Sequence, residues 1–253
     1  MLFTDSVFIG IDPASRHKSF TYAALDKDLN LLTLADGRME KVTSFLGGQS
    51  VATVAVNAPS GVNRGLVRKQ LEKETLSPGQ IQGVEFRAAE LALRLRGIAM
   101  KGTPATAALC SAGVQSGFAL YRQLEKMGFH KYPQKEAVFQ VLETHSHACY
   151  CVLTGQTPLA KSSLEGRLQR QLTLYENGLR IKDPMDFFEE ITRHKIARGI
   201  WPLDLLYSPE QLDALVAAYT AWLAVHKADH ISMIGDAKEG MIVLPEKELK
   251  EKY

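Results

Sequence analysis

Three short apolar segments, each followed by a polar residue, constrain the fold of this chain more than any other feature. Runs of this length, rich in β-branched residues, predict strands that are buried on both faces of a sheet. They are residues 7–11 before Asp12, residues 51–56 before Asn57, and residues 137–142 before Glu143. Segments with helical periodicity lie between and after them, so the order of elements predicts an α/β fold with parallel strands.

The rest of the sequence predicts a hairpin, several helices and a closing pair of strands. Residues 19–25 and 29–34 predict a hairpin, and residues 38–46 a helix that ends at Gly47-Gly48. Polar residues 65–83, with the turn Ser77-Pro78-Gly79, are expected to form a loop that could act as a lid. Further helices are expected at 82–96, 116–127, 146–153, 164–175, 184–198 and 209–225, and strands at 230–234 and 240–244. Without repeats or a linker, we expect one domain over residues 1–253, with a helical elaboration in its C-terminal half.

The composition of the chain bears on whether it binds nucleic acid or a membrane. With 45% hydrophobic and 23% charged residues, the chain is typical of a globular protein. Its net charge of +2 gives no overall attraction to polyanions, so nucleic-acid binding would need a local basic patch. No apolar run is long enough to span a membrane, residues 1–10 lack the basic residues of a signal peptide, and three cysteines suggest a reduced compartment. We therefore expect a cytoplasmic protein without a membrane partner.

The polar residues after the strands predict a site. Ligand sites in open α/β sheets form at the carboxyl ends of the strands, so Asp12, Asn57 and Glu143 are expected to converge there. Asp213 lies at the start of an apolar helix, from which it could point back to the sheet. Asp12, Glu143 and Asp213 would form an all-oxygen site for Mg²⁺ or Mn²⁺. Two such ions could stabilise the attacking water and the leaving oxygen in phosphodiester hydrolysis.

Each of these acids also has a structural interpretation. Asp12 before Pro13 could simply form a turn, and Asp213 could be a capping acid, or one that the helix dipole favours, at a helix start. Glu143 is harder to explain structurally, because an acid after an apolar strand is costly to bury unpaired. The sequence leaves these alternatives open.

Several basic residues are weaker candidates. Lys161 could contact a phosphate as a point charge, or it could be a solvated lysine at a helix start. Arg87, Arg94, Arg96 and Lys101 form a stripe that could guide a nucleic-acid backbone, although intervening acids favour an ordinary charged helix face. His145 and His147 could supply a proton or a metal ligand, but structural roles are expected more often.

Seven short motifs occur in an order that resembles a known family. They are Gly10-Ile11-Asp12-Pro13-Ala14, Asn57-Ala58-Pro59-Ser60-Gly61, residues 87–98, Glu143-Thr144-His145-Ser146-His147-Ala148, and residues 161–167, 212–221 and 239–245. The chain resembles the predicted ribonuclease H-like nuclease family called domain of unknown function 429. The resemblance implies a ribonuclease H-like mixed sheet flanked by helices, with Asp12, Glu143 and Asp213 as metal ligands. The family typically has Asp-Ala-Pro where this chain has Asn57, which can offer a carbonyl oxygen but no charge.

We therefore predict a metal-dependent nuclease that uses Mg²⁺ or Mn²⁺ on RNA or DNA. Its catalytic residues would be Asp12, Glu143, Asp213 and Lys161, and its substrate-binding residues Asn57, Ser60 and Arg87. One alternative is a nucleotide- or phosphosugar-binding enzyme of the actin and sugar-kinase type, although the sequence has no glycine-rich phosphate loop. The other is a ribonuclease H-like binding protein without catalytic activity, which the loss of an acid at Asn57 would suit.

Overall fold

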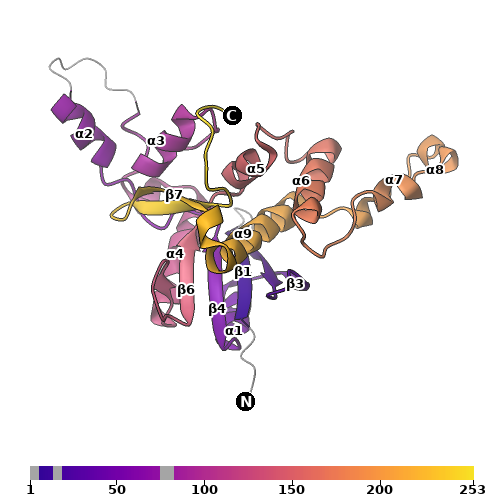
Figure 1. The fold of residues 1–253 in the computed structure, drawn as a ribbon, viewed down its shortest axis with the longest axis horizontal. Helices are drawn as coiled ribbons and strands as arrows, with labels where there is room; N and C mark the ends of the chain where they lie inside the picture. Colours follow the sequence, from indigo (N-terminus) through magenta and orange to yellow (C-terminus); the bar gives the residue numbers. More distant parts are fainter. Residues whose placement is uncertain (1–5, 14–18, 75–82) are drawn as a thin grey trace.

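A computed structural model of the protein describes residues 6–13, 19–74 and 83–253. Within these ranges the strands form one eight-stranded mixed sheet, in the order β3-β2-β1-β4-β6-β8-β7, with β5 paired to β6 (Figure 1). β1 runs parallel to β4, and β4 parallel to β6, whereas β2 is antiparallel to β1. The strands are β1 (Ser6–Pro13), β2 (Phe20–Leu25), β3 (Leu31–Gly37), β4 (Val51–Val56), β5 (His130–Lys131), β6 (Phe139–Glu143), β7 (Ser232–Asp236) and β8 (Gly240–Leu244).

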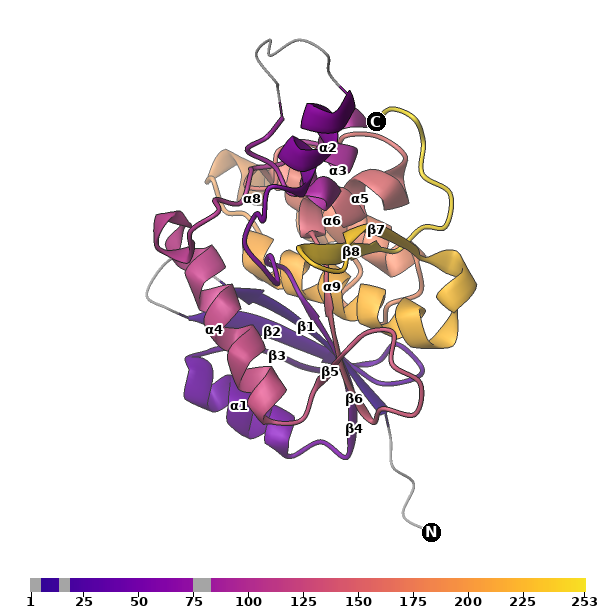
Figure 2. The same ribbon diagram turned by 90° about the vertical axis from the view of Figure 1, so that its left-hand side faces the viewer.

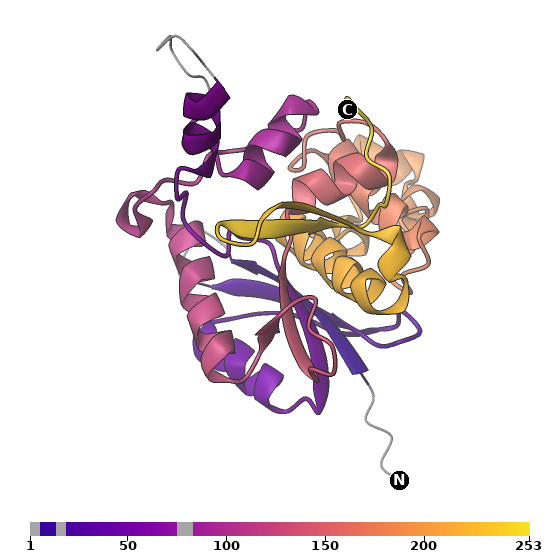
Figure 3. The same cartoon turned by 60° about the vertical axis from the view of Figure 1, so that its left-hand side comes forward.

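Helices cover both faces of the sheet, and each face has its own apolar core. Figure 2 shows α1 (Met39–Gly47) and α4 (Ala112–Lys126) on one side. The other side carries α3 (Ala88–Leu95), α5 (Ser146–Thr154), α6 (Leu164–Glu176) and α9 (Pro209–His226). Figure 3 shows the β7–β8 hairpin, in yellow, beside the orange α9. The remaining short helices are α2 (Leu66–Glu74), α7 (Asp186–Glu190), α8 (Arg193–Ala197), η1 (Ala107–Leu109), η2 (Leu203–Leu205) and η3 (Ala228–His230).

Helix α9 lies directly against the first strand. Its N-terminus is capped by Ser208, whose hydroxyl accepts from the N–H of Gln211, and Pro209 occupies the first helical position. The helix is apolar around most of its circumference because it is buried between the sheet and the outer helices. A Cβ atom on Gly10 of β1 would lie 2.0 Å from the carbonyl oxygen of Ala214, so only glycine permits this approach.

The structure confirms the mixed α/β sheet flanked by helices, the N-terminal hairpin and the closing strand pair. The prediction of a loop at 65–83 is wrong for Leu66–Glu74, which forms α2, because its Leu, Arg, Lys, Gln and Glu residues are good helix formers despite their polarity. The predicted turn at 77–79 lies outside the described residues. The helix predicted over 184–198 is split into α7 and α8 at Ile191, which is extended and followed by the capping residue Thr192. Helix α3 begins at Ala88, later than predicted.

No helix within the described ranges combines the length and apolar character needed to cross a membrane.

Candidate functional site

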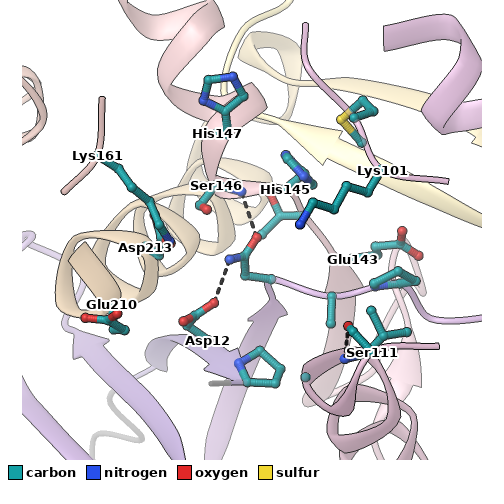
Figure 4. A pocket seen from close by; sticks show the side chains of 18 of the residues that line it. Asp12, Lys101, Ser111, Glu143, His145, Ser146, His147, Lys161, Glu210 and Asp213 are labelled. Carbon is teal, nitrogen blue, oxygen red and sulfur yellow. Dashed lines mark hydrogen bonds and ion pairs between the residues drawn. The ribbon is translucent and has the colours of Figure 1, made fainter. Parts of the chain in front are cut away.

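A cleft with a volume of about 1170 Å³ opens at the carboxyl ends of β1, β4 and β6 (Figure 4). Its lining includes Asp12, Asn57, Glu143, Lys161 and Asp213. The first three follow or end their strands, as the parallel pairing of β1, β4 and β6 requires. Asp213 comes from α9 and Lys161 from the segment before α6. With Arg87, six of the seven predicted site residues therefore line one cleft, and Ser60 is the exception.

A chain of hydrogen bonds fixes Asp12. The side-chain amide of Asn57 donates to Oδ1 of Asp12 at 2.6 Å, and its carbonyl oxygen accepts from the backbone N–H of Ser146 at 2.8 Å (Figure 4). Asn57 thus links the ends of β1 and β4 to the first residue of α5. Its oxygen accepts one hydrogen bond from Ser146, and its contact with a metal or substrate stays a prediction.

Asp213 faces Asp12 from α9. It is almost fully buried, and its Oδ2 accepts from the ammonium of Lys161 at 2.9 Å. Because Ser208 caps the helix, the alternative that Asp213 is the capping residue is wrong. About half of the Lys161 side chain is exposed. Lys161 therefore lines the cleft as a positively charged side chain and is positioned by one ion pair.

The electrostatic environment of Asp12 disfavours its charged form. Burial, the negative charge of Asp213 and, more weakly, that of Glu210 raise the pKa of Asp12 to about 7, whereas the Asn57 hydrogen bond and Lys161 lower it. The side chain is only 8% exposed, so water screens this repulsion poorly. A cation beside Asp12 and Asp213 would relieve it.

Glu143 belongs to a different cluster. Its oxygens accept from Nη2 of Arg87 at 2.5 Å, from Nη1 of Arg87 at 3.2 Å, and from the hydroxyl and N–H of Ser60 at 2.6 and 2.8 Å. Figure 4 shows Glu143 away from Asp12 and Asp213. Over the described ranges, no group of three or more Asp, Glu, His or Cys side chains could hold a metal ion. The predicted three-acid set is therefore not assembled: the structure groups Asp12 with Asp213 and separates Glu143.

The guanidinium of Arg87 joins three parts of the chain, at Glu90, Glu143 and Glu239. Besides Glu143, its guanidinium binds Glu90 of α3 at 2.7 Å and the carbonyl oxygen of Glu239 at 2.8 Å. Glu90 also accepts from the N–H and hydroxyl of Thr103, and Glu239 accepts from the N–H groups of three residues, Arg64, Leu66 and Ala88. Arg87 is 1% exposed and paired with two carboxylates. This cluster fixes the rim of the cleft, and substrate binding by Ser60 and Arg87 stays a prediction.

The roles of three residues were not predicted from the sequence: Glu90, Thr103 and Glu239. A capping-box signal, an acid three residues after the helix N-cap, would have pointed to Glu90. Glu239 lies between the two predicted closing strands, where an acid gives no sign that it will be buried. Its burial depends on the hairpin folding back over α3, which local sequence does not encode.

The two histidines differ in role. His145 caps α5, because its Nδ1 accepts from the N–H of Ala148 at 3.2 Å. Burial lowers its pKa to about 4, assisted by the neighbouring His147. Burial and the charge of Arg170 also lower the pKa of His147, which lines the cleft. A structural role is thus established for His145, and His147 remains available to a ligand.

Two of the four residues of the predicted basic stripe, Arg94 and Arg96, do not line the cleft, whereas Arg87 does. Arg94 lies over the ring of Phe86, and Arg96 donates to the carbonyl oxygen of Ala92 on its own helix. Lys101 lines the cleft. The stripe is therefore not one continuous surface along the cleft.

These features define a mixed α/β protein with a pair of buried carboxylates at the carboxyl edge of its sheet. The chain belongs to the DUF429 family, whose model, described as "Protein of unknown function (DUF429)", matches residues 10–239. That range contains every cleft residue discussed above. Neither the curated proteins nor the solved structures gave a match to the chain.

Proposed function

We propose that the protein is a metal-dependent phosphodiesterase of ribonuclease H-like fold that acts on nucleic acid. The observation that carries the proposal is the buried pair Asp12 and Asp213 at the carboxyl edge of a mixed sheet. The sheet and flanking helices are the architecture that the resemblance to predicted ribonuclease H-like nucleases implies. The resemblance also supplies the substrate class, a phosphodiester of RNA or DNA.

The residues present fit one hard cation. Mg²⁺ commonly binds one or two carboxylates and completes its shell with waters and substrate phosphate oxygens. Oδ2 of Asp12 and Oδ1 of Asp213 are not used in the hydrogen bonds described above, which engage Oδ1 and Oδ2 respectively. Burial first, and then the negative charge of Asp213, raise the pKa of Asp12, and a bound cation would favour its charged form. When bound, the ion would polarise a phosphoryl oxygen and acidify a water molecule.

The protein's own groups then have defined roles. Asn57 orients Asp12, and α9 holds Asp213 rigidly against β1. Lys161 pairs with Asp213 and, because half of its side chain is exposed, could also contact a phosphate oxygen as a point charge. With Glu143 paired to Arg87, we propose a single ion at this pair and not the two-ion arrangement.

Calorimetric titration with Mn²⁺ and cleavage assays in Mg²⁺ or Mn²⁺ test the proposal. The assays should include RNA, DNA, RNA–DNA hybrid and branched substrates. We expect wild-type protein to bind Mn²⁺ and to cleave at least one substrate, and Asp12→Asn and Asp213→Asn to lose both properties. Asp28→Asn, at an exposed acid in the β2–β3 turn, is the matched control and should retain both. Absence of cleavage by the wild type, with Mn²⁺ affinity unaffected by Asp12→Asn, would overturn the proposal.

A binding protein without catalysis is the second candidate. The observation that favours it is Asn57, which contributes an amide where the family typically has an acid, and which holds Asp12 by hydrogen bonding. Carboxylate-dependent Mn²⁺ binding with no cleavage of any substrate would select this candidate.

A further inference from the structure

The end of the cleft beside α5 carries two cations, of which Lys161 forms an ion pair with Asp213 and Arg170 does not. Four residues line the cleft there, Ser146 and His147 at the start of α5, Lys161 before α6, and Arg170 within α6. We call this group the α5 site. Three acids face this group: Asp213, which pairs with Lys161, and Asp12 and Glu210, whose charges also act on Lys161.

Arg170 is the strongest feature of the α5 site. It is 3% exposed, and no carboxylate pairs with it anywhere in the part of the chain that the structure describes. Its Nη1 donates to the carbonyl oxygens of Leu159 and Gly166, and its guanidinium lies over the ring of Tyr150. Buried cations without a carboxylate partner are costly, so the remaining donors of Arg170 point to an anionic ligand.

The start of α5 adds uncharged donors. The Ser146 side chain is 5% exposed and points into the cleft (Figure 4), and over the described residues its hydroxyl has no hydrogen-bond partner. The N–H of Ser146 is bonded to Asn57 and that of Ala148 to His145. The N–H of His147 lies between them in the first turn, where a helix offers no acceptor of its own. The helix N-terminus also favours negative charge.

We infer that the α5 site binds a phosphate group of the substrate, next to the phosphodiester held at Asp12 and Asp213. Arg170 would contribute charge and donors, Lys161 a second charge, and Ser146 and the N–H of His147 short hydrogen bonds. The identity of this phosphate as part of a nucleic acid rests on the proposed function. Its binding to the α5 site does not, because none of these donors needs the metal.

Binding of inorganic phosphate in EDTA, measured by calorimetry, tests the inference without the metal. We expect saturable binding by the wild type and a loss of about tenfold or more in affinity for Arg170→Lys and Ser146→Ala, since each removes hydrogen bonds to an anion. Arg167→Lys is the matched control. Arg167 is on the same helix and also donates to two backbone carbonyl oxygens, those of Leu206 and Tyr207, outside the cleft. Should Arg170→Lys unfold the protein, Ser146→Ala decides alone, because its hydroxyl supports no other contact.

Competition separates the two sources of the phosphate. An oligonucleotide with a 5′-phosphate should displace inorganic phosphate more strongly than the same oligonucleotide without it if the site takes a terminal phosphate. Equal displacement assigns it to an internal phosphodiester. Absence of saturable phosphate binding by the wild type, or unchanged affinity in both variants, would overturn the inference. Phosphate binding that persists in a protein that neither binds Mn²⁺ nor cleaves nucleic acid would reject the proposed function alone.

Discussion

Replacement of Asp12 by asparagine should stabilise the protein at neutral pH while removing a ligand of the proposed metal ion. The folded-state pKa of Asp12 is about 7, above its ordinary value of 3.8. The folded protein therefore holds a proton that the unfolded chain releases, and its stability falls as the pH rises from about 4 through 7. The difference between these two pKa values corresponds to about 4 kcal/mol at most. An asparagine at position 12 would mimic the protonated acid and accept from Asn57 in the same way, so this loss should disappear.

Urea unfolding in EDTA at pH 5 and pH 8 measures the effect. The quantity to compare is the difference in unfolding free energy between Asp12→Asn and the wild type, because His145 titrates in the opposite direction over part of this range. We expect the advantage of the variant to be larger at pH 8 than at pH 5, by about 1 kcal/mol or more. Asp28→Asn should show no such change. A pH-independent difference for Asp12→Asn would refute the argument that uncompensated charge is stored at this residue.

Three further perturbations test the framework of the site. Gly10→Ala should destabilise the protein by about 1–3 kcal/mol or more in urea unfolding, because the new methyl group would overlap the α9 backbone. The control Gly47→Ala should be neutral or stabilising, because its Cβ would meet only the end of the Met127 side chain, at 3.9 Å. Equal effects of the two substitutions would contradict the close contact between Gly10 and α9. Arg87→Met should lower the free energy of unfolding by about 3–5 kcal/mol, because it leaves Glu143 buried and unpaired. Adding Glu143→Gln to this variant should restore part of the lost stability. A mild effect of Arg87→Met alone would argue against the buried cluster. His145, with its pKa lowered to about 4, contributes stability that is lost as the pH falls from 6.5 through 4. His145→Asn can still cap α5 and should make thermal unfolding less sensitive to acid. An NMR titration midpoint for His145 near 6.5 would contradict the prediction.

The sequence predicted the sheet well because its strands are short, apolar and separated by clear turns. Residues 51–56 form β4 with the predicted bounds, and the hairpin at the N-terminus follows from its polar turn. Asp12, Asn57 and Glu143 were placed at one edge by the general rule for parallel strands alone. Such local signals need no knowledge of how distant segments pack.

The grouping of the acids could not be predicted in the same way. Glu143 and Asp12 occupy equivalent positions after parallel strands, yet Glu143 turns to Arg87, which is 56 residues away in sequence. That choice depends on α3 and the β7–β8 hairpin meeting over the end of β6, a tertiary contact with no local signal. The burial of Arg170 was missed for the same reason, since an arginine within an amphipathic helix is usually solvated.

The contact between Gly10 and α9 has a consequence for the precision of the carboxylate pair. Asp12 lies two residues after Gly10, and Asp213 directly precedes Ala214, whose carbonyl oxygen meets the position of the absent side chain. The two acids are thus held on main chains that touch each other, with no intervening side chain to change rotamer. Substitutions elsewhere in the core can repack the protein without altering the spacing of the pair. Enlargement of that spacing, for example to admit a larger cation, would require moving a helix relative to a strand.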